Sequence, residues 1–132
     1  MAADTSAVLG EPDADRYLAA IRQAPTIAMS AMSVYETRVV LSGRIKGARN
    51  APAGAREEFE SWLVIHRVDI APFDADQAVL AHRAYLRFGK GFHPAALNLA
   101  DCAAYALATS RDEPLLFKGD DFPRTDVRSA LA

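Results

Sequence analysis

Residues 98–108 read Asn-Leu-Ala-Asp-Cys-Ala-Ala-Tyr-Ala-Leu-Ala, a stretch that is apolar on nearly every side apart from one aspartate. A helix that is apolar all round is usually buried, so we predict a buried helix over residues 98–110 with Asp101 in its first turn. A carboxylate at the mouth of such a helix is costly unless something cationic meets it. The alternative is that Asp101 only caps the helix, because a negative charge favours a helix N-terminus.

The segments on either side of this helix alternate between strand-like and helix-like patterns. Strands are predicted at residues 2–4, 26–29, 68–72 and 115–117, with a short final element at 127–131. Helices are predicted at residues 11–23, 31–46 and 55–65, and from Asp74 as the cap to about Phe88. Strands separated by helices favour a parallel sheet with helices on both faces. The predicted fold class is therefore α/β, with three α/β/α layers around a central parallel sheet.

Composition narrows the class of protein. A chain of 132 residues with 51% hydrophobic content predicts one domain with a real core. The single cysteine, Cys102, rules out an intramolecular disulfide and is expected to be a small core residue. No apolar run approaches the ~20 residues of a membrane span, and no signal peptide is evident, so we expect a cytoplasmic protein. The three histidines show no mutual ligand spacing.

Acidic residues stand at three further places in this apolar chain. Asp4 follows the first predicted strand, Glu36 lies in a helix, and the pair Asp120-Asp121 follows the strand before Gly119. Ligands of parallel sheets bind beyond the carboxyl ends of the strands, where Asp4 and Asp120 are both expected. Gathered carboxylates repel one another and lose hydration, and a hard divalent cation is the usual remedy. The pattern suggests a magnesium-dependent nuclease.

Each of these acids also has a purely structural explanation. Asp4 could cap the next helix or stabilise a turn. Glu36 could close a Ser33-x-x-Glu36 capping box, although the helix more naturally begins near Ser30. One of the two aspartates after Gly119 is expected to be structural.

The net charge of −2 does not by itself indicate nucleic-acid binding, but residues 82–98 carry basic side chains and no acid. Arg83, Arg87 and Lys90 alternate with aromatic residues there, a pattern that could follow a phosphate backbone and stack bases. The alternative is the solvated face of a helix and its exit loop.

Taken together, these segments resemble the PIN-domain ribonucleases, and specifically the VapC toxins of VapBC toxin–antitoxin pairs. The resemblance spans essentially the whole chain, and its most specific parts are the two C-terminal blocks. The matching segments are residues 4–7 (Asp-Thr-Ser-Ala), 10–14 (Gly-Glu-Pro-Asp-Ala), Glu36, 72–74 (Pro-Phe-Asp), 87–91 (Arg-Phe-Gly-Lys-Gly), 93–102 (His-Pro-Ala-Ala-Leu-Asn-Leu-Ala-Asp-Cys) and 115–122 (Leu-Leu-Phe-Lys-Gly-Asp-Asp-Phe). Only Val8 and Leu9 separate the first two, fewer residues than the family usually has, which indicates either a shortened first helix or residues missing from the sequence.

The resemblance implies a magnesium site, in which Mn²⁺ could replace Mg²⁺. Its four acids would be Asp4, Glu36, Asp101 and Asp120, with Asp121 as the alternative to Asp120. Asp4 and Asp101 would hold the metal directly, while Glu36 and Asp120 would orient the attacking water or position a second ion. The resemblance also makes Thr5, Ser6 and Lys118 candidate contacts of the substrate phosphates. The basic pattern adds Arg87 and Lys90 as candidate RNA contacts.

The resemblance also implies partners: an RNA substrate and a VapB-like antitoxin. We further expect a homodimer, which would form a heterotetramer or a larger assembly with the antitoxin, because Met29, Met32 and Tyr35 are expected at the surface. A basic antitoxin side chain pairing with Asp4 and Asp101 would block the site. Two alternatives remain open, namely a metal-dependent phosphoesterase acting on DNA or small phosphates, and a catalytically impaired PIN-like binding module.

Overall fold

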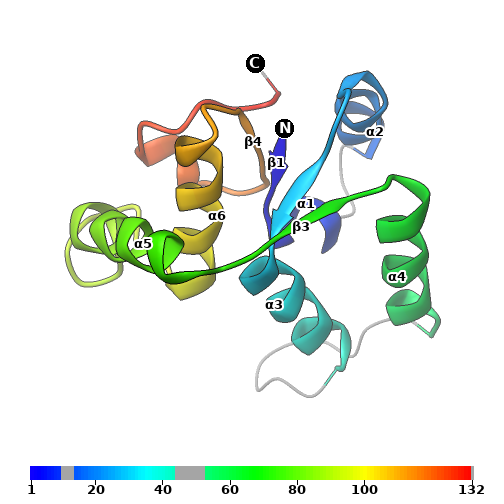
Figure 1. Ribbon diagram of the computed structural model, residues 1–132, viewed down its shortest axis with the longest axis horizontal. Helices are drawn as coiled ribbons and strands as arrows, with labels where there is room; N and C mark the ends of the chain where they lie inside the picture. The colour runs from blue at the N-terminus through cyan, green and yellow to red at the C-terminus, as the bar shows by residue number, and fades with distance from the viewer. Residues whose placement is uncertain (10–13, 44–52, 132) are drawn as a thin grey trace.

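The computed structural model describes residues 1–9, 14–43 and 53–131, which form a sheet with helices packed around it (Figure 1). The elements are β1 (Ala2–Ala3), α1 (Thr5–Leu9), α2 (Ala14–Gln23), β2 (Ala28–Ser30), α3 (Ala31–Leu41), α4 (Ala55–Ile65), β3 (Asp69–Ala71), α5 (Ala75–Phe88), α6 (Leu99–Ser110), β4 (Leu115–Leu116) and the 3₁₀ helix η1 (Phe122–Arg124).

Most of the predicted elements are confirmed, and the differences lie at their ends. The helix predicted over 31–46 ends at Leu41, and its last predicted residues, 44–46, lie outside the described ranges, as do residues 11–13 of the helix predicted from residue 11. The expected element at 127–131 is only a bridge, in which Ser129 pairs with Leu115. Residues 10–13, directly after α1, lie outside the described ranges, so the expected shortening of the first helix stays a prediction.

The four strands are parallel and lie in the order β3-β2-β1-β4. The chain therefore runs outward from β1 to β3 and then returns to the other side of β1 for β4. This reversal puts a topological switch point between the carboxyl ends of β1 and β4, where open α/β sheets bind their ligands.

Alternating side chains of the strands give the sheet two apolar faces. Ala2 and Leu115 belong to a core cluster with residues of α5 and α6, whereas Ala3 and Leu116 belong to a second cluster with residues of α1, α2, α3 and α4. Figure 1 shows α5 and α6 on one side of the strands and α2 and α4 on the other. The predicted three-layer α/β/α fold with a parallel sheet is confirmed.

The helices also follow the sequence signals closely. Asp74 caps α5 as predicted, because its carboxylate accepts a hydrogen bond from the Gln77 N–H at 3.0 Å. The helix ends at Phe88, because Gly89 adopts an extended conformation. Position 89 requires glycine, since a β-carbon there would lie 2.3 Å from the Tyr85 carbonyl oxygen. In α6, all residues from Cys102 to Ala108 are buried, which confirms the predicted core helix. None of the helices in the described ranges is both long and apolar enough to cross a membrane.

One expectation about the surface is wrong. Met29 is fully buried in β2, because its side chain belongs to the core cluster on the α4 side of the sheet. Met32 is half-buried and Tyr35 is 63% exposed, so only part of the expected apolar surface near α3 exists.

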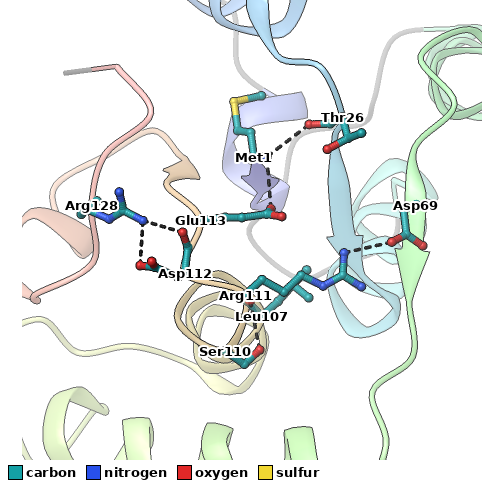
Figure 2. Close-up of polar contacts among 9 residues, drawn as sticks. All are labelled: Met1, Thr26, Asp69, Leu107, Ser110, Arg111, Asp112, Glu113 and Arg128. Atoms are coloured by element: carbon teal, nitrogen blue, oxygen red, sulfur yellow. Dashed lines mark hydrogen bonds and ion pairs between the residues drawn. The ribbon is translucent and has the colours of Figure 1, made fainter.

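At the amino ends of the strands, acidic side chains are matched with cations (Figure 2). Arg111 donates to Asp69 at 2.9 Å, and Arg128 donates to Asp112 at 3.0 Å. The ammonium group of Met1 lies 3.1 Å from Glu113 and donates to the Thr26 carbonyl. The charges of these acidic side chains at the amino edge of the sheet are thus paired with cations. The carboxyl edge differs in this respect.

Candidate active site

Asp4 lies at the switch point, directly after β1, and its side chain is only 2% exposed. One carboxylate oxygen, Oδ2, accepts hydrogen bonds from the Ser6 hydroxyl at 2.7 Å and from the Ser6 N–H at 3.0 Å. The other, Oδ1, is buried and has no hydrogen-bond partner. An unsatisfied buried acceptor is costly. Burial raises the pKa of Asp4 against the opposing hydrogen bonds from Ser6, and the charge of Asp121 raises it further.

Asp101 caps its helix and also interacts electrostatically with other acidic side chains. It closes a capping box at the start of α6, where its Oδ2 accepts from the Asn98 N–H at 3.0 Å and the Asn98 side chain accepts from the Asp101 N–H at 2.8 Å. Burial nevertheless raises its pKa to about 7, and the charges of Asp4, Glu36 and Asp121 add to that shift. The cap therefore does not remove Asp101 from the acidic cluster.

Glu36 lies inside α3 rather than at its start. The helix is capped by Ser30, whose hydroxyl accepts from the Met32 N–H at 3.2 Å, so the capping box considered for Ser33 and Glu36 is not formed. Burial raises the pKa of the half-buried Glu36 carboxyl, the nearby Thr5 hydroxyl lowers it, and the charge of Asp4 raises it.

Of the two neighbouring aspartates after β4, Asp121 is the one whose charge acts on Asp4 and Asp101. Gly119 has a φ of 92°, in the left-handed region that favours glycine, and the chain turns there into η1. Both aspartates are exposed, but the charge of Asp121, and not that of Asp120, raises the pKa of Asp4 and Asp101. Phe122 is buried against the ring of Phe117 and anchors the segment beside Asp121.

The acidic cluster formed by Asp4, Glu36, Asp101 and Asp121 lacks cations in the described part of the chain. The ion pairs found there involve other carboxylates, and no group of three or more His, Cys, Asp or Glu side chains among the described residues is arranged to hold a metal ion. Carboxylates that interact across a partly buried space without a cation suit an open site, in which one or two of them bind a metal and water completes the coordination.

Three of the predicted substrate residues lie next to this cluster, but their polar groups are engaged. The Thr5 hydroxyl is buried and donates to the Ser33 carbonyl at 3.0 Å. The Ser6 hydroxyl binds Asp4 and accepts from the Lys118 N–H at 3.0 Å. The Lys118 ammonium lies 4.5 Å from the centre of the Tyr17 ring. The sequence analysis missed the bond between Ser6 and Asp4, although a serine two residues after an aspartate is a recognised local pattern.

The other two predicted substrate residues lie at the end of α5 and in the loop after it. Arg87 is exposed but forms an ion pair with Asp126 at 3.3 Å, and Asp126 also accepts a hydrogen bond from Tyr105. Lys90 is exposed in the loop that leads to Asn98 and α6. Arg87 is therefore not merely a solvated side chain, and no signal in the sequence pointed to its pairing with Asp126.

The arrangement of the sheet agrees with the comparison with known families. The profile of the PIN domain matches residues 1–128 of the chain. The chain belongs to the PIN-domain family.

Within the PIN-domain family, the relatives are VapC ribonucleases. Ribonuclease VapC30 of Mycobacterium tuberculosis is 42% identical over 131 residues, which cover 96% of this chain and 95% of VapC30. Ribonuclease VapC of Mycolicibacterium smegmatis is 43% identical over 131 residues, which cover 96% of this chain and 97% of that protein. The resemblance to the VapC toxins of VapBC systems is thereby confirmed.

The PIN fold is also found by comparison of structures. The crystal structure of Mycobacterium tuberculosis VapC20, described as a sarcin-ricin loop cleaving toxin, superposes with a TM-score of 0.68. The two proteins are 17% identical, and the match covers 96% of this chain and 98% of VapC20. This likeness concerns the fold.

Proposed function

We propose that this PIN-domain protein is a Mg²⁺-dependent endoribonuclease that acts as the toxin of a type II toxin–antitoxin pair. The observation that carries the proposal is the buried, unpartnered Oδ1 of Asp4 at the switch point, facing a set of interacting carboxylates with no cation among the described residues. Its similarity to the VapC ribonucleases supports RNA as the substrate.

The residues of the acidic cluster fit a divalent ion. Mg²⁺ prefers carboxylate oxygens, is usually held by one or two of them, and keeps several waters. Asp4 and Asp101 are the proposed direct ligands, since each has one oxygen engaged in a hydrogen bond to its own segment and the other oxygen left over. The same donor set would also accept Mn²⁺.

The metal, when bound, would supply a water of lowered pKa and stabilise negative charge on the phosphoryl oxygens. We assign Glu36 and the exposed Asp121 to orienting the attacking water, in place of the originally predicted pair of Glu36 and Asp120. Burial and the charge of Asp4 raise the pKa of the Glu36 carboxyl, which favours its protonated form relative to an ordinary glutamate. The product expected from the family is a 5′-phosphate and a 3′-hydroxyl.

RNA would approach along the end of α5 and the loop that leads into α6. Arg83 and Lys90 are exposed there, and the side chain of Phe92 is 61% exposed, so that it can stack on a base. Arg87 would contribute only in part, because its charge is shared with Asp126. The predicted contacts of Lys118 and Thr5 stay proposals. Cleavage of cellular RNA would take place in the cytoplasm.

The proposed partners are a VapB-like antitoxin and a second copy of the chain, which together would form a heterotetramer or a larger assembly. An apolar groove between α5 and α6 supports the contact between copies, since Leu86 and Leu99 line it and each is at least 50% exposed. An antitoxin arginine or lysine paired with Asp4 and Asp101 would compete directly with the metal.

The proposal is tested by comparing the wild type with Asp101→Asn on RNA and on DNA of the same sequence. The wild type should cleave RNA, and not DNA, only when Mg²⁺ or Mn²⁺ is present. Asp101→Asn should lose this activity, because the charge that helps hold the metal is removed while the cap at Asn98 is kept. Equal cleavage of DNA would favour a phosphoesterase of another class. Binding of RNA without cleavage would favour an impaired binding module.

A further inference from the structure

A chain of hydrogen bonds links β4 to the carboxylate of Asp4 through Ser6. The Lys118 N–H donates to the Ser6 hydroxyl oxygen at 3.0 Å, and that hydroxyl donates to Asp4 Oδ2 at 2.7 Å. The Ser6 N–H adds a second bond to the same Oδ2 at 3.0 Å. A serine hydroxyl has a single proton to donate. Because that proton is given to Asp4, the Ser6 hydroxyl cannot also donate to an RNA phosphate, which was its predicted role.

The same bonds join the two strands that meet at the switch point. Asp4 directly follows β1, and its own N–H donates to the Leu116 carbonyl of β4 at 2.9 Å. Lys118 follows β4 and precedes the Gly119 turn that leads to Asp121. From the opposite side, the Tyr17 hydroxyl of α2 donates to the Phe117 carbonyl at 2.8 Å. The segment of Phe117 and Lys118 is thus held between α2 and Ser6.

Ser6 forms hydrogen bonds with only one of the two carboxylate oxygens of Asp4. Oδ2 receives both hydrogen bonds, whereas Oδ1 is buried and receives none. A carboxylate fixed in this way cannot rotate to exchange its oxygens without breaking two bonds, so the same atom is always presented to a ligand. Partners of this kind, which orient a metal-binding carboxylate, are a recurring part of metal sites.

We propose that Ser6 is a positioning residue of the metal centre. It holds the Asp4 carboxylate so that Oδ1 is the free ligand atom, and it ties Asp4 to the segment that carries Asp121. The inference rests on the proposed metal-dependent function, and it replaces the substrate contact expected for Ser6 with a role that acts through Asp4.

The test measures Mn²⁺ binding and RNA cleavage separately in Ser6→Ala and Ser6→Thr. Mn²⁺ is titrated calorimetrically in the absence of RNA, and kcat and KM for RNA are then determined at saturating metal. Ser6→Ala should weaken Mn²⁺ binding by about 10- to 100-fold, the usual effect of removing such a partner, and should lower kcat while leaving KM nearly unchanged. Ser6→Thr keeps the hydroxyl and should recover most of the loss. Ser61→Ala, an exposed serine of α4, is the matched control and should behave as the wild type.

Two results would overturn the inference. If Ser6→Ala binds Mn²⁺ as tightly as the wild type but has a raised KM, Ser6 is a substrate contact. If it matches the wild type in both measurements, Ser6 has no role in the site. Failure of the proposed function would look different, because the wild type and Ser61→Ala would then bind no Mn²⁺ either.

A second variant covers the case in which Ser6→Ala does not fold. Tyr17→Phe removes the hydroxyl that holds the Phe117 carbonyl but keeps the ring beneath Lys118. It acts on the same segment from the other side, so it should weaken Mn²⁺ binding in the same direction and by a smaller factor. Unchanged Mn²⁺ affinity in a folded Tyr17→Phe would refute the link between this segment and Asp4.

Discussion

Replacing Asp101 by asparagine should stabilise the metal-free protein, although it is expected to abolish activity. Asp101 interacts unfavourably with the charges of Asp4, Glu36 and Asp121, and burial disfavours its charged form. Asparagine removes the charge, and its side-chain oxygen can still accept the hydrogen bond from the Asn98 N–H that closes the capping box. If Asp101 were only a cap, the same substitution would be neutral or destabilising.

The sign and size of the effect follow from the raised pKa of Asp101. Its carboxyl has a pKa of about 7 in the folded chain and an ordinary value of 3.8. The folded state therefore binds more protons than the unfolded state between these values, and stability falls as the pH rises through this window. The full shift corresponds to about 4 kcal/mol as an upper bound. Because the carboxyl is partly exposed and solvent screens its interactions, we expect on the order of 1–2 kcal/mol.

Urea unfolding of the wild type and Asp101→Asn, with EDTA present, measures this difference. Asp101→Asn should be the more stable protein at about pH 8, and the difference should shrink toward zero below about pH 3, where the wild-type carboxyl is mostly protonated in both states. In thermal unfolding the same difference corresponds to roughly 3–10 °C for a chain of this size. A variant that is less stable than the wild type at the higher pH, or a difference that does not change with pH, would show that the acidic cluster is not under electrostatic strain.

Four further outcomes follow from the same structure. Mg²⁺ at about 100 times its Kd should raise the unfolding free energy of the wild type by about 2.7 kcal/mol and that of Asp101→Asn by much less. Thermal unfolding with and without the ion measures this difference, and equal stabilisation of the two proteins would argue against Asp101 as a ligand. Reversing the charges of Arg83 and Lys90 should weaken RNA binding and flatten its salt dependence in fluorescence anisotropy without changing Tm, since fewer counterions are released. Reversing Arg87 should in addition lower Tm, because a carboxylate would then face Asp126; an unchanged Tm would mean that this ion pair contributes nothing. Asp74→Ala removes the cap of α5 and should cost about 1 kcal/mol of unfolding free energy with RNA cleavage unchanged, and a loss of cleavage at equal folded fraction would contradict its purely structural role.

The dimer can be tested on the groove between α5 and α6. Sedimentation at micromolar concentration should show a dimer for the wild type and a monomer for Leu86→Lys or Leu99→Lys, because a charge would be placed in an apolar contact. Val64→Lys is a suitable control, since Val64 is 76% exposed on α4, away from the groove. A wild type that sediments as a monomer would refute the homodimer.

Local sequence signals were sufficient wherever a feature depends on neighbouring residues. Asp74 was predicted to cap α5 and does, because capping joins a side chain to an N–H three residues later. The apolar run after Asp101 predicted a buried helix, because a helix with no polar face has to be covered on all sides. The alternation of strands and helices fixed the parallel sheet, and with it the edge at which Asp4 would lie, since successive parallel strands all end on the same side.

What only the tertiary structure decided are contacts between segments far apart in the chain. Ser6 receives the N–H of Lys118 from 112 residues away, and Arg87 pairs with Asp126 from 39 residues away. After the turn at Gly119, it is the charge of Asp121 that raises the pKa of Asp4 and Asp101, and this is the basis on which we propose Asp121 in place of Asp120. Met29 is buried because helices from other parts of the chain cover its face of the sheet. Spacing along the sequence specifies the period and ends of each element, whereas the packing of elements against one another specifies which side chains meet.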